Sequence, residues 1–171
     1  MLSRTLVAAF AVIAAVAIGI LLIRPRLGPA PHAIVLVRHA EKADQSADTA
    51  LSPAGEARAL HLAEILGGLG VRAIYTSEFK RTAQTAQPTA QRLGLTPVVV
   101  PAQDTAGLVQ RLHREHPTDN TLIVGHADTL PELIRQLGVK DPVDLPGNEY
   151  GNLYIVVTHP TGPPTLLRLH Y

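Results

Sequence analysis

The chain has 171 residues, of which 46% are hydrophobic and 17% are charged, a composition too apolar for a disordered protein. It contains no cysteine, which excludes disulfide frameworks, thiolate nucleophiles, zinc ribbons and iron–sulfur clusters. Of its 15 Lys and Arg residues, three lie within the first 33 positions. The rest of the chain therefore carries 12 basic against 14 acidic side chains, and this net charge of −2 argues against a nucleic-acid partner.

The first predicted element is an apolar segment over residues 6–23, 18 residues without a polar side chain. As a helix it would span roughly 27 Å, close to the ~30 Å hydrocarbon core of a bilayer. We expect residues 1–33 to form a transmembrane helix and a proline-rich spacer, and residues 34–171 to form one domain. The favoured interpretation is a single-pass membrane anchor with the domain exported to the periplasmic or extracellular side. A cleaved signal peptide followed by secretion is the alternative.

Short apolar runs then alternate with helical patterns along the rest of the chain. Strands are predicted over residues 33–37, 71–76, 97–100 and 121–124, and helices over residues 53–66, 80–93, 105–115 and 130–137. Two last strands, 152–158 and 165–169, flank a proline-rich turn and indicate an antiparallel hairpin. This order predicts an α/β fold: a mainly parallel sheet with helices on both faces and an antiparallel C-terminal hairpin.

Polar side chains follow three of the predicted strands, at the point where each strand ends. His39 comes just after the first strand, residues 77–81 follow the second, and His126 follows the strand over residues 121–124. Ligands of parallel sheets bind beyond the carboxyl ends of the strands. We therefore expect these three groups to converge on one edge of the sheet.

The motifs at this edge resemble those of the histidine phosphatase superfamily, also called the phosphoglycerate mutase-like family, over roughly residues 34–157. The family's Arg-His-Gly-Glu appears as Arg38-His39-Ala40-Glu41, with Ala40 in place of glycine. Its Ser-x-x-x-Arg-x-x-x-Thr segment appears at Ser77, Arg81 and Thr85, and its second histidine appears in Gly125-His126.

This resemblance implies a role for each of these side chains. His39 would attack phosphorus and carry a phosphohistidine intermediate, and His126 would donate to the phosphoryl oxygens. Arg38 and Arg81 would bind the phosphate with their guanidinium forks, while Ser77 would either bond phosphate or cap a turn. The two arginines supply the positive charge, so the scheme needs neither a metal nor a cofactor.

The general acid that protonates the leaving group is left open among three carboxylates. Asp104 leads, because the family often places an acid on the loop beyond the third strand. Asp128, two residues after His126, and Glu149 are the competitors. We expect Glu41 to orient the loop or to pair with an arginine rather than to transfer protons.

The predicted function is a metal-independent phosphatase acting on a small molecule, a lipid or glycan head group, or a phosphoprotein. A mutase is disfavoured because the 138 residues after the spacer leave little room for enclosing insertions. The alternative is a membrane-tethered module that binds a phosphorylated ligand without turnover.

Overall fold

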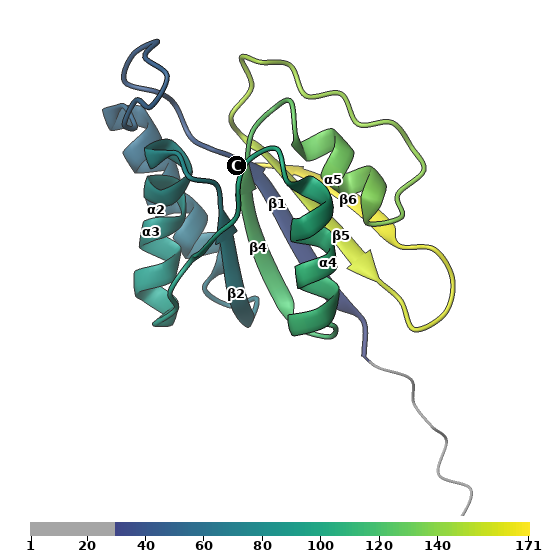
Figure 1. Ribbon diagram of the computed structural model, residues 1–171. Helices are drawn as coiled ribbons and strands as arrows, with labels where there is room; N and C mark the ends of the chain where they lie inside the picture. The colour runs from purple at the N-terminus through teal and green to yellow at the C-terminus, as the bar shows by residue number, and fades with distance from the viewer. Residues whose placement is uncertain (1–29) are drawn as a thin grey trace, which may run out of the picture.

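The computed structural model describes residues 30–171, which form a six-stranded sheet of order β3-β2-β4-β1-β5-β6 (Figure 1). The strands are β1 (His32–Arg38), β2 (Val71–Thr76), β3 (Val98–Val99), β4 (Asn120–Gly125), β5 (Asn152–Thr158) and β6 (Thr165–His170). Strands β3, β2, β4 and β1 are parallel, whereas β5 and β6 are antiparallel to their neighbours. The mainly parallel sheet and the terminal hairpin are thus confirmed.

The four helices of the described residues cover both faces of the sheet, as predicted. They are α2 (Pro53–Leu66), α3 (Lys80–Leu93), α4 (Thr105–Glu115) and α5 (Leu130–Gln136). Helices α2 and α3 pack on one face, and α4 and α5 pack on the other (Figure 1).

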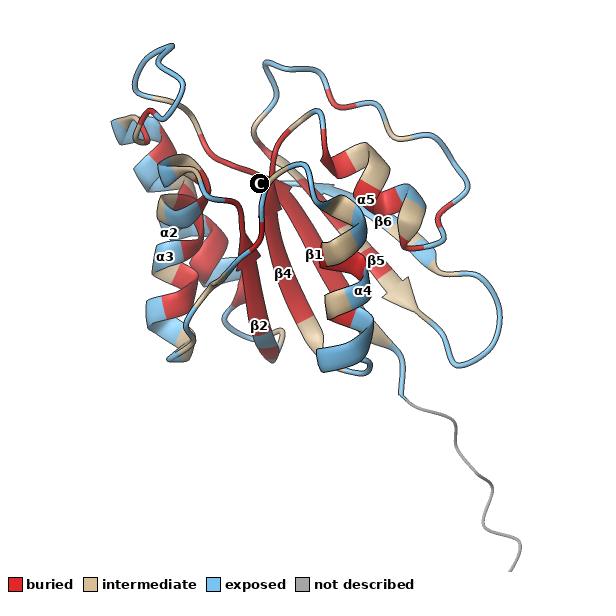
Figure 2. Cartoon of the chain, in the orientation of Figure 1, coloured by how far each residue is buried: buried red, intermediate tan, exposed pale blue. Residues whose placement is uncertain are grey.

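Strand β1 shows how the sequence requires this double cover. Val35 and Val37 join the core under α2 and α3, while Ile34 and Leu36 join the core under α4 and α5, and all four side chains are fully buried. Successive strand residues point to opposite faces, so a continuous apolar run needs helices on both sides. Figure 2 shows the buried inner strands between the two helical layers.

Local signals in the sequence set the helix ends. Ser52 caps α2 by accepting a hydrogen bond from the backbone N–H of Gly55, and Gly94 ends α3 in the left-handed conformation at φ 65°. Gly55 also lies directly against the backbone of Glu41, where a Cβ would collide with the Glu41 carbonyl oxygen. The start of α2 is therefore packed tightly on the loop that follows β1.

The third strand is shorter than the sequence predicted. The strand expected over residues 97–100 is reduced to Val98–Val99, because β3 pairs with β2 only at Tyr75–Val98 and Thr76–Val99 and is flanked by Pro97 and Pro101.

Within residues 30–171, no helix is long and apolar enough to span a bilayer. The predicted membrane segment, residues 6–23, lies outside the described residues.

Candidate functional site

The site lies at the carboxyl ends of three neighbouring strands. His39 follows β1, Ser77 follows β2 and His126 follows β4, and these strands are adjacent in the order β2-β4-β1. The rings of His39 and His126 lie 5.3 Å apart between centroids. The loops over residues 39–52 and 138–151 rise on either side of this edge (Figure 1). The structure thus brings together residues 87 positions apart, as expected from the parallel topology.

His39 is buried and held in one orientation. Its backbone N–H donates to Gly125 O (2.9 Å), and its Nδ1 lies 2.8 Å from the carbonyl oxygen of Ala40. A carbonyl can only accept, so Nδ1 carries the proton and Nε2 keeps a free lone pair. Burial lowers the pKa of His39 to about 4, and the nearby guanidinium of Arg38 adds to this shift, although the Ala40 carbonyl opposes it. At neutral pH the ring is an uncharged nucleophile.

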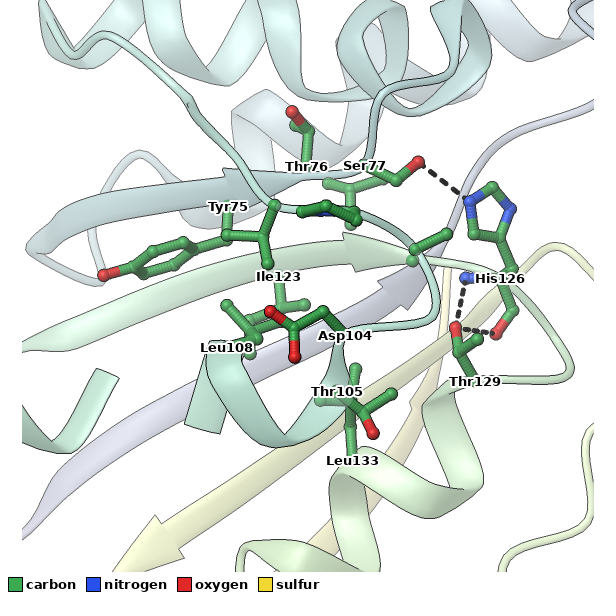
Figure 3. Close-up of a pocket in the computed structure, with 15 residues that line it drawn as sticks. Tyr75, Thr76, Ser77, Asp104, Thr105, Leu108, Ile123, His126, Thr129 and Leu133 are labelled. Carbon is green, nitrogen blue, oxygen red and sulfur yellow. Dashed lines mark hydrogen bonds between the residues drawn. The ribbon is translucent and has the colours of Figure 1, made fainter. Parts of the chain in front are cut away.

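His126 is fixed at both ring nitrogens. Its Nδ1 lies 3.4 Å from Nη2 of Arg81, which can only donate, so Nε2 carries the proton and donates to Ser77 Oγ at 2.8 Å (Figure 3). Ser77 Oγ lies 2.9 Å from Thr82 Oγ1 as well. Burial, followed by the charge of Arg81, lowers the pKa of His126 to about 4. Ser77 therefore orients the second imidazole.

Arg38 is held by the loop that contains Glu149, through contacts that the sequence did not predict. Its Nη1 donates to the backbone oxygen of Glu149 (3.0 Å), and its Cζ lies 4.1 Å from the ring centroid of Tyr150. The Tyr150 ring also lies 6.0 Å from the ring of His39. The Nε of Arg38 is buried and has no hydrogen-bond partner among residues 30–171.

Arg81 is held in the same manner from the other side. Its Nη1 donates to the backbone oxygen of Ala47 (2.8 Å), and its Cζ lies 4.2 Å from the ring centroid of Phe79. Its Nε is also buried without a partner. Buried donors without a partner are uncommon in folded proteins. Two such N–H groups beside two neutral imidazoles form a cup suited to an oxyanion.

Thr85 fixes the backbone after the candidate nucleophile. Its Oγ1 accepts from the N–H of Ala40 (2.9 Å) and donates to the carbonyl of Arg81 (2.7 Å). Ala40 is fully buried and packs with Leu51 and Ala59, and no non-glycine residue of the described chain has a positive φ. The loop therefore accommodates alanine at the position where the family motif has glycine.

Glu41 pairs with an arginine, which is one of the two roles expected for it. Nε of Arg58 lies 2.9 and 3.0 Å from the two carboxylate oxygens of Glu41, and Nη2 lies 2.7 Å from Oε1. Arg58 also donates through Nη1 to the backbone oxygen of Tyr171 (2.7 Å). The Glu41 carboxylate is therefore engaged in holding the loop.

The three candidate acids occupy different places. Asp104 caps α4 by accepting from Gly107 N (2.9 Å) and lines a hollow together with Ser77 and His126 (Figure 3). Asp128 lines a separate surface hollow. The carboxylate of Glu149 accepts from Asn152 Nδ2 (2.6 Å). Of the three, Asp104 alone shares a hollow with the second histidine.

Sequence reasoning missed several contributors to this site. Two of them, Tyr150 and Phe79, contribute a ring face, and Ala47 contributes a backbone oxygen. Arg58 binds Glu41 from a position 17 residues later in the sequence. Phe79 lies between two motif residues, which was an available signal. Nothing in the local sequence marks Ala47 or Tyr150.

Comparisons with known proteins concern the fold and the family motifs of the chain. The family model described as histidine phosphatase superfamily (branch 1) matches residues 34–104. Among curated proteins, none matches the chain. The protein histidine phosphatase SixA, solved with tungstate, has a TM-score of 0.67 at 20% identity, over 81% of this chain and 96% of its own.

Two mycobacterial structures share the fold as well. A glucosyl-3-phosphoglycerate phosphatase has a TM-score of 0.62 at 19% identity, over 76% of this chain and 92% of its own. A structure titled mycobacterial hydrolase 1 has a TM-score of 0.67 at 19% identity, over 80% of this chain and 97% of its own. These solved structures, each 20% identical or less to the chain, show that its fold is that of histidine phosphatases, and the family model matches the first part of the domain.

Acid should destabilise the folded protein through its two buried imidazoles. The unfolded chain takes up protons below the ordinary histidine pKa of 6.5, whereas the folded pKa values of His39 and His126 are about 4, so stability falls as pH drops from 7 to 5. We expect roughly 1–2 kcal/mol per imidazole. Urea unfolding at both pH values should show a smaller loss for His126→Gln than for wild type. The control is His113→Gln, at an exposed position of α4, which should lose as much stability between pH 7 and 5 as wild type does. An equally large loss in His126→Gln would contradict the prediction.

Tyr150 should strengthen anion binding by keeping Arg38 in place. Tyr150→Leu removes the ring from the guanidinium face, and a cation–π contact of about 0.5–1.5 kcal/mol predicts roughly twofold to tenfold weaker binding of inorganic phosphate. Tyr150→Phe keeps the ring and should bind as wild type does. Calorimetric titration compares the three proteins; equal affinity of the Leu and Phe variants would contradict the role.

Proposed function

We propose that this protein is a metal-independent phosphatase that hydrolyses phosphate monoesters through a phosphohistidine intermediate on His39. The observation that carries the proposal is the free Nε2 of a buried, neutral imidazole, placed beside two guanidinium groups that each retain a buried unpaired N–H. A nucleophile and an oxyanion cup in one place are the minimum that phosphoryl transfer requires.

Substrate binding is the first step of the proposed reaction. The phosphoryl dianion accepts hydrogen bonds from the remaining donors of Arg38 and Arg81. Arg38 already donates to Glu149 O, and Arg81 already donates to Ala47 O and to His126 Nδ1. The negative charge of the ligand raises the pKa of His126. Once protonated, His126 gains an Nδ1–H donor that stabilises the oxygens in the transition state.

Transfer to His39 follows. The Nε2 lone pair forms a bond to phosphorus while the bond to the alcohol oxygen breaks, and that oxygen leaves with the electron pair. Asp104 acts as the general acid that supplies the proton. A water molecule then attacks the phosphohistidine, Asp104 takes its proton, and the N–P bond breaks to release phosphate and the free imidazole.

Asp104 is our choice among the three acids because of its location. It lines the same hollow as Ser77 and His126, whereas Asp128 lines a different hollow and the carboxylate of Glu149 is bonded to Asn152. Its capping contact uses Oδ1, which leaves the second carboxylate oxygen for proton transfer.

The proposal has two further elements, a second substrate class and attachment to a membrane. A phosphohistidine side chain is a second substrate class, supported by the likeness to the protein histidine phosphatase SixA. Membrane attachment, with the domain on the exported side and access to lipid or glycan head groups, is supported by the apolar sequence of residues 6–23. A binding module without turnover is the competing function.

His39→Ala should abolish both turnover and the phosphoenzyme. Without the imidazole no N–P bond forms, so phosphate release and acid-labile labelling of the protein should both fall to background. His113→Ala, at an exposed position of α4, is the matched control and should retain full activity. Turnover that persists in His39→Ala refutes the mechanism, and a wild-type protein that binds phosphate yet turns over no ester is the binding module.

Asp104→Asn separates acid catalysis from helix capping, because asparagine caps a helix as well as aspartate does. An alkyl phosphate needs its leaving oxygen protonated, and an aryl phosphate with a good leaving group does not. We expect hydrolysis of the alkyl ester to fall about 10²- to 10⁴-fold and that of the aryl ester to change little. The same assay on Asp128→Asn and Glu149→Gln would identify either as the acid instead.

A further inference from the structure

An apolar hollow lies beside the candidate site, between the start of α4, the start of α5 and the ends of β2 and β4 (Figure 3). Its free volume of about 20 Å³ is small, enough for the centre of one or two water-sized groups. Ser77, His126 and Asp104 form its polar side. Its apolar side chains are Val100, Leu108, Ile123 and Leu133.

We propose that this hollow binds a short aliphatic part of the alcohol that leaves from phosphorus. The inference rests on the proposed phosphatase function and adds a substrate class to it: phosphate monoesters of small, unbranched aliphatic alcohols. Two observations support the inference: the apolar residues that line the hollow, and the position of His126 between the hollow and the arginines.

The connection is through His126. His126 forms one wall of the hollow and also contacts Arg81, and its ring lies 5.3 Å from that of His39 between centroids. An ester whose phosphate is held by the arginines therefore reaches the hollow with its first carbons. Asp104 also lines the hollow, and in the proposed reaction it protonates the oxygen that leaves.

The hydroxyl groups of the walls either have a partner within the chain or, as in Tyr75 and Thr76, point away from the hollow (Figure 3), which selects against hydroxyl groups of a substrate. Thr105 Oγ1 accepts from Gln136 Nε2 (3.1 Å), and Thr129 Oγ1 lies 3.4 Å from both the N and O atoms of His126. A substrate hydroxyl inside the hollow would lose its water partners and find few replacements, whereas a methylene group gains from leaving water.

The test compares methyl, ethyl and propyl phosphate with 2-hydroxyethyl phosphate, which replaces the last methyl group of the propyl ester with a hydroxyl. The value of kcat/KM should rise about threefold to fourfold per methylene from methyl to propyl, since each buried methylene contributes a nearly constant free energy. The 2-hydroxyethyl ester should be hydrolysed at least tenfold less efficiently than the propyl ester.

A pair of variants assigns the effect to the hollow. Ala102 is half-buried at its rim, so Ala102→Leu fills the space, whereas Ala106→Leu adds the same side chain at an exposed position of α4 outside the lining. We expect Ala102→Leu to remove the chain-length dependence and Ala106→Leu to preserve it. The inhibition constant of inorganic phosphate, measured on each variant, reports whether the anion cup is intact.

The outcomes separate this inference from the function on which it rests. Equal kcat/KM for the propyl and 2-hydroxyethyl esters, or a chain-length dependence that survives in Ala102→Leu, would overturn the subsite. If no ester is hydrolysed although phosphate binds, the proposed function fails. The subsite is then decided by calorimetry, which should show tighter binding of propyl than of 2-hydroxyethyl phosphate, and equal affinities would overturn it.

Discussion

Two buried imidazoles, with ring centroids 5.3 Å apart, lie within reach of the charges of two guanidinium groups, and the rest of the site follows from how those charges are accommodated. Because His39 and His126 are withdrawn from water beside fixed cations, both remain neutral in the free protein. The same lack of solvent makes any bound anion interact strongly with Arg38 and Arg81. The dianion of a phosphoryl group would thus compensate the charges of the two arginines.

Both arginines are positioned by the same pair of contacts. Each guanidinium gives one Nη1 hydrogen bond to a backbone oxygen, at Glu149 or Ala47, and lies over an aromatic ring, that of Tyr150 or Phe79. This arrangement uses a small part of the donor capacity and immobilises the planar fork without a carboxylate partner. A paired carboxylate would have neutralised the charge that an anion-binding site requires.

The sequence predicted the parts of this protein that depend on local chemistry or on topology. Ser52 and Gly94 marked helix ends, the apolar run of β1 marked a doubly covered strand, and the parallel order predicted that His39 and His126 would meet. It could not predict the contacts of Tyr150 or Ala47. These depend on the path of long loops, and a backbone oxygen leaves no trace in the residue type. The sequence also could not decide the role of Asp104, because an aspartate just before a helix can be either a catalytic acid or an ordinary helix cap.

Arg58 joins segments that lie on opposite flanks of the nucleophile. Through Glu41 it holds the loop after β1, and through the backbone oxygen of Tyr171 it holds a residue whose own N–H donates to Gly151, the neighbour of Tyr150 (2.9 Å). Helix α2 therefore acts as a brace between the two loops. Both loops therefore depend on the same side chain for their positions.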